Sequence, residues 1–223
     1  MRVGFLVSGR GSNLAAVLQA IALGELPGVE PVVVISNRDG VSALSVADRY
    51  GVPARVLARS AFASRDERDA AIGRALAAGG ADLALLAGYD QLLGRSFFDA
   101  FGGRTVNIHP SLLPRHGGKG MVGLAVHAAV LAAGDEETGV TIHDVTAELD
   151  SGPAIATCRV PVLPGDEAAT LAARVLREEH RLLVTTLRRL ASLPEPAGPS
   201  ASMAALPAPA RLGGDAQRNP PHA

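Results

Sequence analysis

The 223-residue chain has no tryptophan, two tyrosines, five phenylalanines and a single cysteine, Cys158. One cysteine cannot form an intramolecular disulfide, so the core must hold the fold together, and a reducing, cytoplasmic location is expected. With so few aromatic side chains, that core has to be built mainly from alanine, valine and leucine. Such a composition is typical of buried parallel strands covered by alanine-rich helices.

The chain also lacks an excess of either charge, since 21 lysines and arginines face 22 aspartates and glutamates. A large nucleic-acid footprint needs a concentrated basic face, so no nucleic-acid partner is expected. No segment reaches the ~18 to 20 uncharged apolar residues of a membrane span. The apolar run at the N-terminus stops at Ser8 and is better explained as a buried strand than as a signal peptide. We therefore expect no membrane partner either.

Short apolar runs alternate with longer amphipathic segments, which predicts an α/β fold: a mostly parallel, Rossmann-like sheet with helices on both faces. Strands are expected at residues 2–7, 31–36, 54–57, 83–86 and 105–109, and helices at 13–23, 42–50, 65–78, 96–101, 124–133 and 167–190. Ser64 and Glu67 form a capping box at the start of the third helix. Two further apolar runs, 139–143 and 154–160, have no long helix between them. They either pair with each other or extend the sheet edge.

This pattern predicts one domain over residues 1–192, followed by a tail over residues 193–223. The tail is rich in proline, alanine and glycine and has almost no periodic apolar face. Such a segment buries too little surface to offset its conformational entropy, so we expect it to be disordered.

A glycine-rich turn, Ser8 to Asn13, falls where the first strand gives way to the first helix. Gly11 lets the backbone approach an anion closely, and the helix start at Ser12 and Asn13 offers free N–H groups. A dinucleotide site fits less well, because Leu14 stands where its third glycine would be and no acidic residue ends the second strand. The turn therefore predicts a site for one phosphate monoester. A glycine turn without a ligand is the alternative.

Asn107 and His109 lie two residues apart on the fifth strand, so their side chains point to the same side. Together they could stabilise an oxyanion and move a proton, and a carboxylate at Asp150 could orient the imidazole and raise its pKa. Each also has a structural explanation: the first two could satisfy local backbone groups, and Asp150 could close a turn. The other histidines show no metal-ligand spacing, so no metal is expected.

These phrases, in their order and spacing, resemble the phosphoribosylglycinamide formyltransferases, folate-dependent enzymes of purine synthesis, over residues 1–190. The matching segments are residues 8–13, Arg65 within 62–65, 86–89, 107–114, 138–143, 148–153, and 179–180.

The resemblance implies a formyltransferase domain that acts on two small molecules, 5-phosphoribosylglycinamide and the co-substrate 10-formyltetrahydrofolate, without a metal. Gly11, Ser12 and Asn13 would hold the phosphate, Glu179 would meet the ribose hydroxyls, and Arg65 would face the glutamate tail of the folate. The folate pocket would also include Asp90, Gln91, Leu92, Leu93, Asn107, Thr146, Ala147, Glu148, Leu149 and Asp150. Asn107, His109 and Asp150 would carry catalysis, in a monomer or a homodimer.

Two departures from the family pattern bear on folate binding. Relatives often have Met-Arg where this chain has Asp90-Gln91, so a cationic contact to the folate tail is expected to be missing. The loop over residues 115–124 also differs and looks like a subgroup variant.

Three other functions compete with this interpretation. A methionyl-tRNA formyltransferase would need a second, basic C-terminal domain, which the Pro/Ala-rich tail cannot form. A formyltetrahydrofolate deformylase shares the Asn/His/Asp set but usually carries a small N-terminal regulatory domain, for which the glycine loop at Ser8 leaves no room. A phosphosugar- or nucleotide-binding regulator on the same sheet is the non-enzymatic alternative.

Overall fold

The computed structural model describes residues 1–146 and 152–192. The predicted tail lies outside this description, as do four of the predicted site residues, Ala147, Glu148, Leu149 and Asp150. None of the helices within the described ranges is long and apolar enough to cross a membrane.

Within the described ranges, seven strands and six α-helices follow one another in the order that the apolar pattern predicts. The strands are β1 (Arg2–Val7), β2 (Glu30–Ser36), β3 (Ala54–Val56), β4 (Leu83–Leu86), β5 (Arg104–His109), β6 (Glu137–Asp144) and β7 (Ala154–Pro161). The helices are α1 (Ser12–Ala22), α2 (Ser42–Arg49), α3 (Arg65–Ala78), α4 (Arg95–Phe101), α5 (Leu124–Ala132) and α6 (Ala168–Ser192), with a short 3₁₀ helix, η1 (Arg59–Ala61).

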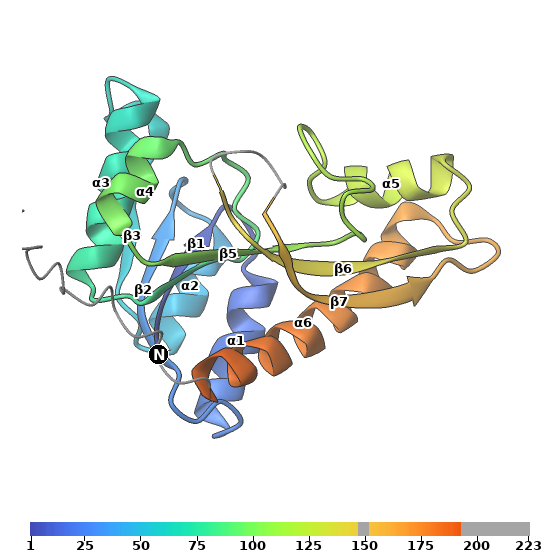
Figure 1. The fold of residues 1–223 in the computed structure, drawn as a ribbon, viewed down its shortest axis with the longest axis horizontal. Coiled ribbons are helices and arrows are strands. Elements are labelled where there is room, and N and C mark those ends of the chain that lie inside the picture. Colours follow the sequence, from blue (N-terminus) through green and yellow to red (C-terminus); the bar gives the residue numbers. More distant parts are fainter. Residues whose placement is uncertain (147–151, 193–223) are drawn as a thin grey trace, which may run out of the picture. The chain divides into compact units, whose positions relative to one another are not determined.

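The strands form one sheet in the order β3-β2-β1-β4-β5-β6-β7 (Figure 1). Strands β1 to β5 are parallel, whereas β6 runs antiparallel to β5, and β7 runs antiparallel to β6. The predicted α/β class is thus confirmed. Both options for the last two apolar runs also hold at once, because β6 and β7 pair with each other and extend the sheet beyond β5.

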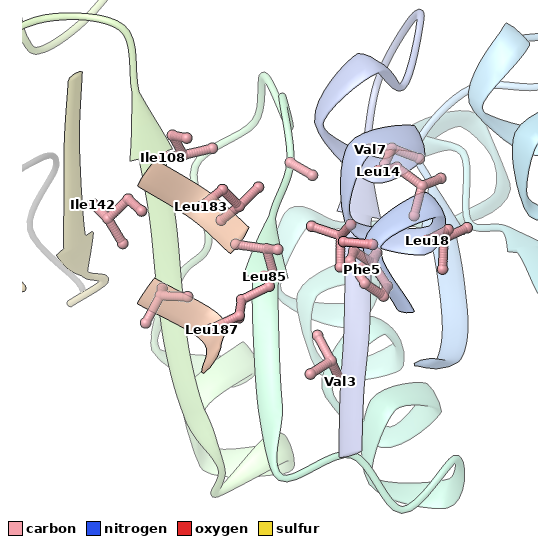
Figure 2. Packing of buried hydrophobic residues seen from close by; sticks show 14 of the residues in the cluster. Val3, Phe5, Val7, Leu14, Leu18, Leu85, Ile108, Ile142, Leu183 and Leu187 are labelled. Atoms are coloured by element: carbon pink, nitrogen blue, oxygen red, sulfur yellow. The ribbon is translucent and has the colours of Figure 1, made fainter. Parts of the chain in front are cut away.

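Buried side chains form two apolar clusters, because successive residues of a strand point to opposite faces of the sheet. In β1, Val3 and Phe5 belong to the cluster that includes α1, α2, α5 and α6, whereas Leu6 belongs to the cluster of α3 and α4. Figure 2 shows part of the first cluster, where Leu183 and Leu187 of α6 lie near strand residues. Helices cover both faces, as predicted.

Helices α3 and α4 approach each other closely at Gly73, which is buried. A Cβ at this position would lie 2.7 Å from the carbonyl oxygen of Phe97 and 2.9 Å from Cβ of Ala100. Both distances are shorter than real Cβ contacts, and one of the two partners is backbone. Glycine is therefore required here by the packing of two helices, not by a turn.

We predict that Gly73→Ala destabilises the protein even though alanine is the better helix former. The propensity gain is about 1 kcal/mol, whereas overpacking of a tight core contact costs about 1–3 kcal/mol. Urea unfolding should show a lower midpoint for Gly73→Ala and nearly no change for Arg74→Ala, the exposed neighbour on α3. A midpoint raised by Gly73→Ala would show that the two helices separate freely.

Candidate functional site

A cavity of about 1030 Å³ opens at the carboxyl ends of β1, β4 and β5. This is the point where the strand order reverses, since β1 lies between β2 and β4, and such crevices are where open α/β sheets bind ligands. The walls come from the loops after β1 and β4, the end of β5, the loop before α5, and one side of α6.

The cavity brings together every predicted site residue that the structure describes. The lining includes Gly11, Ser12, Asn13, Arg65, Asp90, Gln91, Leu92, Leu93, Asn107, His109, Thr146 and Glu179. Residues more than 160 positions apart in the sequence thus share one space. Their individual roles stay predictions at this point.

Gly11 is the N-cap of α1 and has left-handed backbone angles, with φ 75° and ψ 30°. A Cβ there would also lie 2.7 Å from Cβ of Ala43, so both conformation and space require glycine. No side chain in the described part of the chain caps this helix. Its first N–H groups are therefore available to an anion in the cavity.

Asn13 and Glu179 meet across the same end of the cavity. The Nδ2 of Asn13 donates to Oε2 of Glu179 over 2.7 Å, and both residues are buried. Burial raises the pKa of Glu179, against the opposing effects of the Asn13 hydrogen bond and Arg10. The Oδ1 of Asn13 is buried without a hydrogen-bond partner within the described part of the chain. The pair can therefore accept hydrogen bonds from the hydroxyl groups of a ligand.

Asn107 is oriented by a neighbour that sequence reasoning did not identify as a site residue, His143. The two residues face each other in the β5–β6 register, and Nδ2 of Asn107 lies 3.1 Å from Nε2 of His143. The other ring nitrogen, Nδ1, lies 2.9 Å from the carbonyl oxygen of Asp144. A neutral ring protonated on Nδ1 satisfies both contacts, since a carbonyl can only accept.

His109 is 5 % exposed, and its imidazole is held through Nε2, which lies 2.9 Å from the carbonyl oxygen of His116. Because a carbonyl accepts, Nε2 carries a proton, and Nδ1 is the ring nitrogen that this contact does not use. A second buried imidazole, His127, lines the same cavity. Burial, and then the nearby His109, lower the pKa of His127.

Asp90 is tied into the cavity wall by two residues that follow β2. The Nδ2 of Asn37 donates to Oδ1 of Asp90 over 2.8 Å, and Arg38 forms an ion pair with the other carboxylate oxygen. Burial alone would raise the pKa of Asp90, but these contacts, together with hydrogen bonds to Ser8 and Gln91, lower it overall. Asp90 is thus an anion neutralised by Arg38.

The cavity wall is nonetheless rich in cations: Arg38, Arg59, Arg65 and Arg68 all line it. Arg68, which sequence reasoning missed, is only 1 % exposed and donates through NH1 to Oε1 of Gln91 over 3.1 Å. The sequence predicts that a cationic contact is missing at Gln91. Arg68 on α3 places a guanidinium against the side chain of this residue.

Asp69 holds this arginine cluster in place. Its Oδ1 accepts from Nε and NH2 of Arg68 over 3.0 and 2.7 Å. Its Oδ2 accepts from the backbone N–H of Gly94 over 2.7 Å and from Nε of Arg65 over 3.3 Å. The carboxylate is fully buried, so one anion fixes two arginines and the start of α4.

Among the described residues, no three histidine, cysteine, aspartate or glutamate side chains are grouped as they would be around a metal ion. The chemistry that the geometry offers is instead anion binding at α1, amide and imidazole groups at the end of β5, and a cationic wall at α3.

The model of the formyl transferase family matches residues 1–187. The chain belongs to this family. Its members include the phosphoribosylglycinamide formyltransferase of Escherichia coli K12, which is 37% identical over 182 residues, a match covering 82% of this chain and 83% of that protein.

Other relatives are much longer proteins. The trifunctional purine biosynthetic protein adenosine-3 of Drosophila melanogaster is 41% identical over 181 residues, which are 80% of this chain but only 13% of that protein. The corresponding share of the Gallus gallus protein is 18%. This formyl transferase chain thus matches less than a fifth of each.

Solved structures agree with the fold. Glycinamide ribonucleotide transformylase 1 from Symbiobacterium toebii superposes with a TM-score of 0.80 at 41% identity, covering 86% of this chain and 87% of that one. Phosphoribosylglycinamide formyltransferase from Brucella melitensis does so with a TM-score of 0.77 at 41% identity, covering 86% and 95%.

We predict that Asp69→Ala strongly destabilises this formyl transferase domain. It leaves Arg68 buried without its carboxylate, and breaking a buried ion pair from one side costs about 3–5 kcal/mol. Guanidinium unfolding measures the change. Asp99→Ala serves as the control, because its pair with Arg95 is exposed and such pairs contribute less than about 1 kcal/mol. Equal effects of the two substitutions would contradict the anchoring role of Asp69.

Proposed function

We propose that the protein transfers the formyl group of 10-formyltetrahydrofolate to the amine of 5-phosphoribosylglycinamide, a step of purine biosynthesis. The observation that carries the proposal is one cavity that joins an uncapped helix start at Gly11 to the amide and imidazole of Asn107 and His109. The names of the relatives and of the solved structures support the choice of substrates.

At one end of the cavity, the backbone N–H groups around Gly11, Ser12 and Asn13 would bind the phosphate of the ribosyl substrate. The helix dipole favours an anion there. Glu179 would accept from the ribose hydroxyls, as a buried carboxylate already oriented by Asn13. The substrate amine would then extend from this anchor towards the end of β5.

At the other end, Arg65 would meet the glutamate tail of the folate. Its side chain is 44 % exposed although its Nε is fixed by the buried Asp69, so a ligand can reach the guanidinium. Asp90 to Leu93 and Thr146 would line the pterin pocket. Ala147, Glu148, Leu149 and Asp150 would complete it; they lie outside the described residues.

The neutral amine would attack the formyl carbon and form a tetrahedral intermediate whose oxygen carries the negative charge. An amide nitrogen has two hydrogens: on Nδ2 of Asn107, one is directed to His143, and the second is left for the oxyanion. The protonated imidazole of His109 would supply another donor. The attacking nitrogen loses a proton and the folate nitrogen gains one as the carbon–nitrogen bond breaks, and Asp150 would orient His109 and a relaying water.

The proposal also includes the remaining expectations: no metal, no nucleic-acid or membrane partner, a cytoplasmic location, and a monomer or homodimer. None of the steps above requires a group other than the two substrates, a water and these side chains.

The experiment that tests the proposal follows folate product by absorbance with purified protein, formyl folate and 5-phosphoribosylglycinamide. We expect product only when both substrates are present. Product formed with water alone would indicate a deformylase. Binding of the phosphorylated substrate without any formyl transfer would indicate the phosphosugar-binding regulator.

We predict that His109→Ala and Asp150→Ala each lower kcat by about 100- to 1,000-fold, the usual cost of losing a group that stabilises the transition state. Calorimetry should show that binding of 5-phosphoribosylglycinamide is nearly unchanged, because the phosphate and ribose contacts are made by other residues. Loss of substrate binding with an unchanged kcat would place these two residues in a binding role instead.

A further inference from the structure

The loop that follows β5 turns back and contacts the imidazole of His109 through a residue that does not line the large cavity. The carbonyl oxygen of His116 accepts a hydrogen bond from Nε2–H of His109. His116 does not itself line the large cavity but borders a separate hollow of about 260 Å³ together with Asp135. The contact is thus made on the side away from the substrates.

The backbone of His116 is in the left-handed region, with φ 53°, and among the described residues it is the one non-glycine with a positive φ. A glycine would adopt this φ without strain, and Gly117 and Gly118 follow directly. The backbone conformation of the turn therefore does not explain why a histidine stands at position 116.

The side chain of His116 contacts Asp135. The Nε2 of His116 donates to Oδ2 of Asp135 over 2.6 Å, and Arg115 forms an ion pair with the other oxygen. The side chain of Asp135 is 7 % exposed, and its pKa is lowered, chiefly by the hydrogen bond from His116. Asp135 follows α5, and its backbone N–H donates to the carbonyl of Val130, so the anchor belongs to a helix end.

The rest of the turn is fixed to β6. The Oγ of Ser111 donates to the carbonyl oxygen of Arg115 over 2.6 Å. The Oγ1 of Thr141 donates to the carbonyl oxygen of Ser111 over 2.8 Å and accepts from the N–H of Leu113 over 3.1 Å. The Oγ of Ser111 also lies 3.4 Å from the carbonyl oxygen of His116, which accepts from Nε2 of His109. This carbonyl therefore joins the tethered turn to the imidazole of His109.

We infer that His116 and Asp135 are positioning residues for formyl transfer: Asp135 holds the side chain of His116, and the carbonyl of His116 holds Nε2–H of His109. This fixes the tautomer and the ring plane of His109, and it directs Nδ1 to the reacting groups. The inference rests on the proposed function, since it concerns how the imidazole is presented to the formyl carbon.

A double-mutant cycle tests this inference, because a positioning effect must disappear when the positioned group is absent. Asp135→Ala should lower kcat by about ten- to a hundredfold in the otherwise unchanged protein, the cost of misplacing a reacting group by a fraction of an ångström. In the His109→Ala background the same substitution should change kcat less than about twofold. His116→Gly, which keeps the left-handed backbone but removes the anchor, should behave like Asp135→Ala.

Glu137→Ala is the matched control. It removes a carboxylate of the same charge two residues away, which pairs with exposed Arg159 and not with His116, and it should leave kcat unchanged. KM for 5-phosphoribosylglycinamide should stay constant in all variants. An equal loss of kcat in both backgrounds, or a loss that follows a lower melting temperature, would show a purely structural role and overturn the inference. Absence of formyl transfer by the unchanged protein would overturn the proposed function, and the inference with it.

Discussion

The reversal of strand order between β1 and β4 is the constraint on which the site depends. The chain passes from β1 outwards to β2 and β3 and must then cross back to β4, so the loops after β1 and β4 diverge and leave a crevice between them. Ser8 joins these two loops by hydrogen bonds. Its N–H donates to the carbonyl of Gly88 over 3.2 Å, and its Oγ accepts from the N–H of Asp90 over 3.0 Å. The glycine-rich turn after β1 and the loop after β4 are therefore fixed to each other.

The antiparallel strand β6 adds the side chain of His143 to the crevice. Because β6 runs against β5, His143 stands directly opposite Asn107 and can orient the amide. A parallel neighbour would have placed its own carboxyl end, with a loop, at this point. The mixed sheet thus supplies a rigid second side chain where the reaction is proposed to occur, next to a loop that is tethered through Thr141.

The local pattern of the sequence was enough for most of the fold. The five parallel strands agree with the predicted segments to within one or two residues, and Ser64 caps α3 as expected, accepting from the N–H of Glu67 over 3.1 Å. Apolar periodicity reports which residues face a core, and this information is local. The pairing of β6 and β7 could not be chosen from it, since both arrangements bury the same residues.

The location of the candidate site could be predicted where glycine, asparagine and histidine residues stand at the end of a strand. It could be predicted less well where side chains from separate loops meet. Contacts such as Asp135 with His116, or Asp90 with Asn37 and Arg38, join charged or polar side chains from separate loops. No periodicity marks such pairs, because the loop conformations that bring them together depend on the whole fold. Asp150 could be proposed only from the resemblance of the sequence to the family and from the chemistry of a carboxylate. It lies outside the described residues.

The most direct test of the central claim is a crystal structure with 5-phosphoribosylglycinamide and a non-reactive folate analogue bound together. We expect the phosphate on the backbone N–H groups of Gly11 to Asn13, and the carbonyl that mimics the formyl group within hydrogen-bond reach of both Asn107 and His109. A phosphate elsewhere, or a folate whose reacting end lies away from the end of β5, would contradict the claim that one crevice brings the two substrates together.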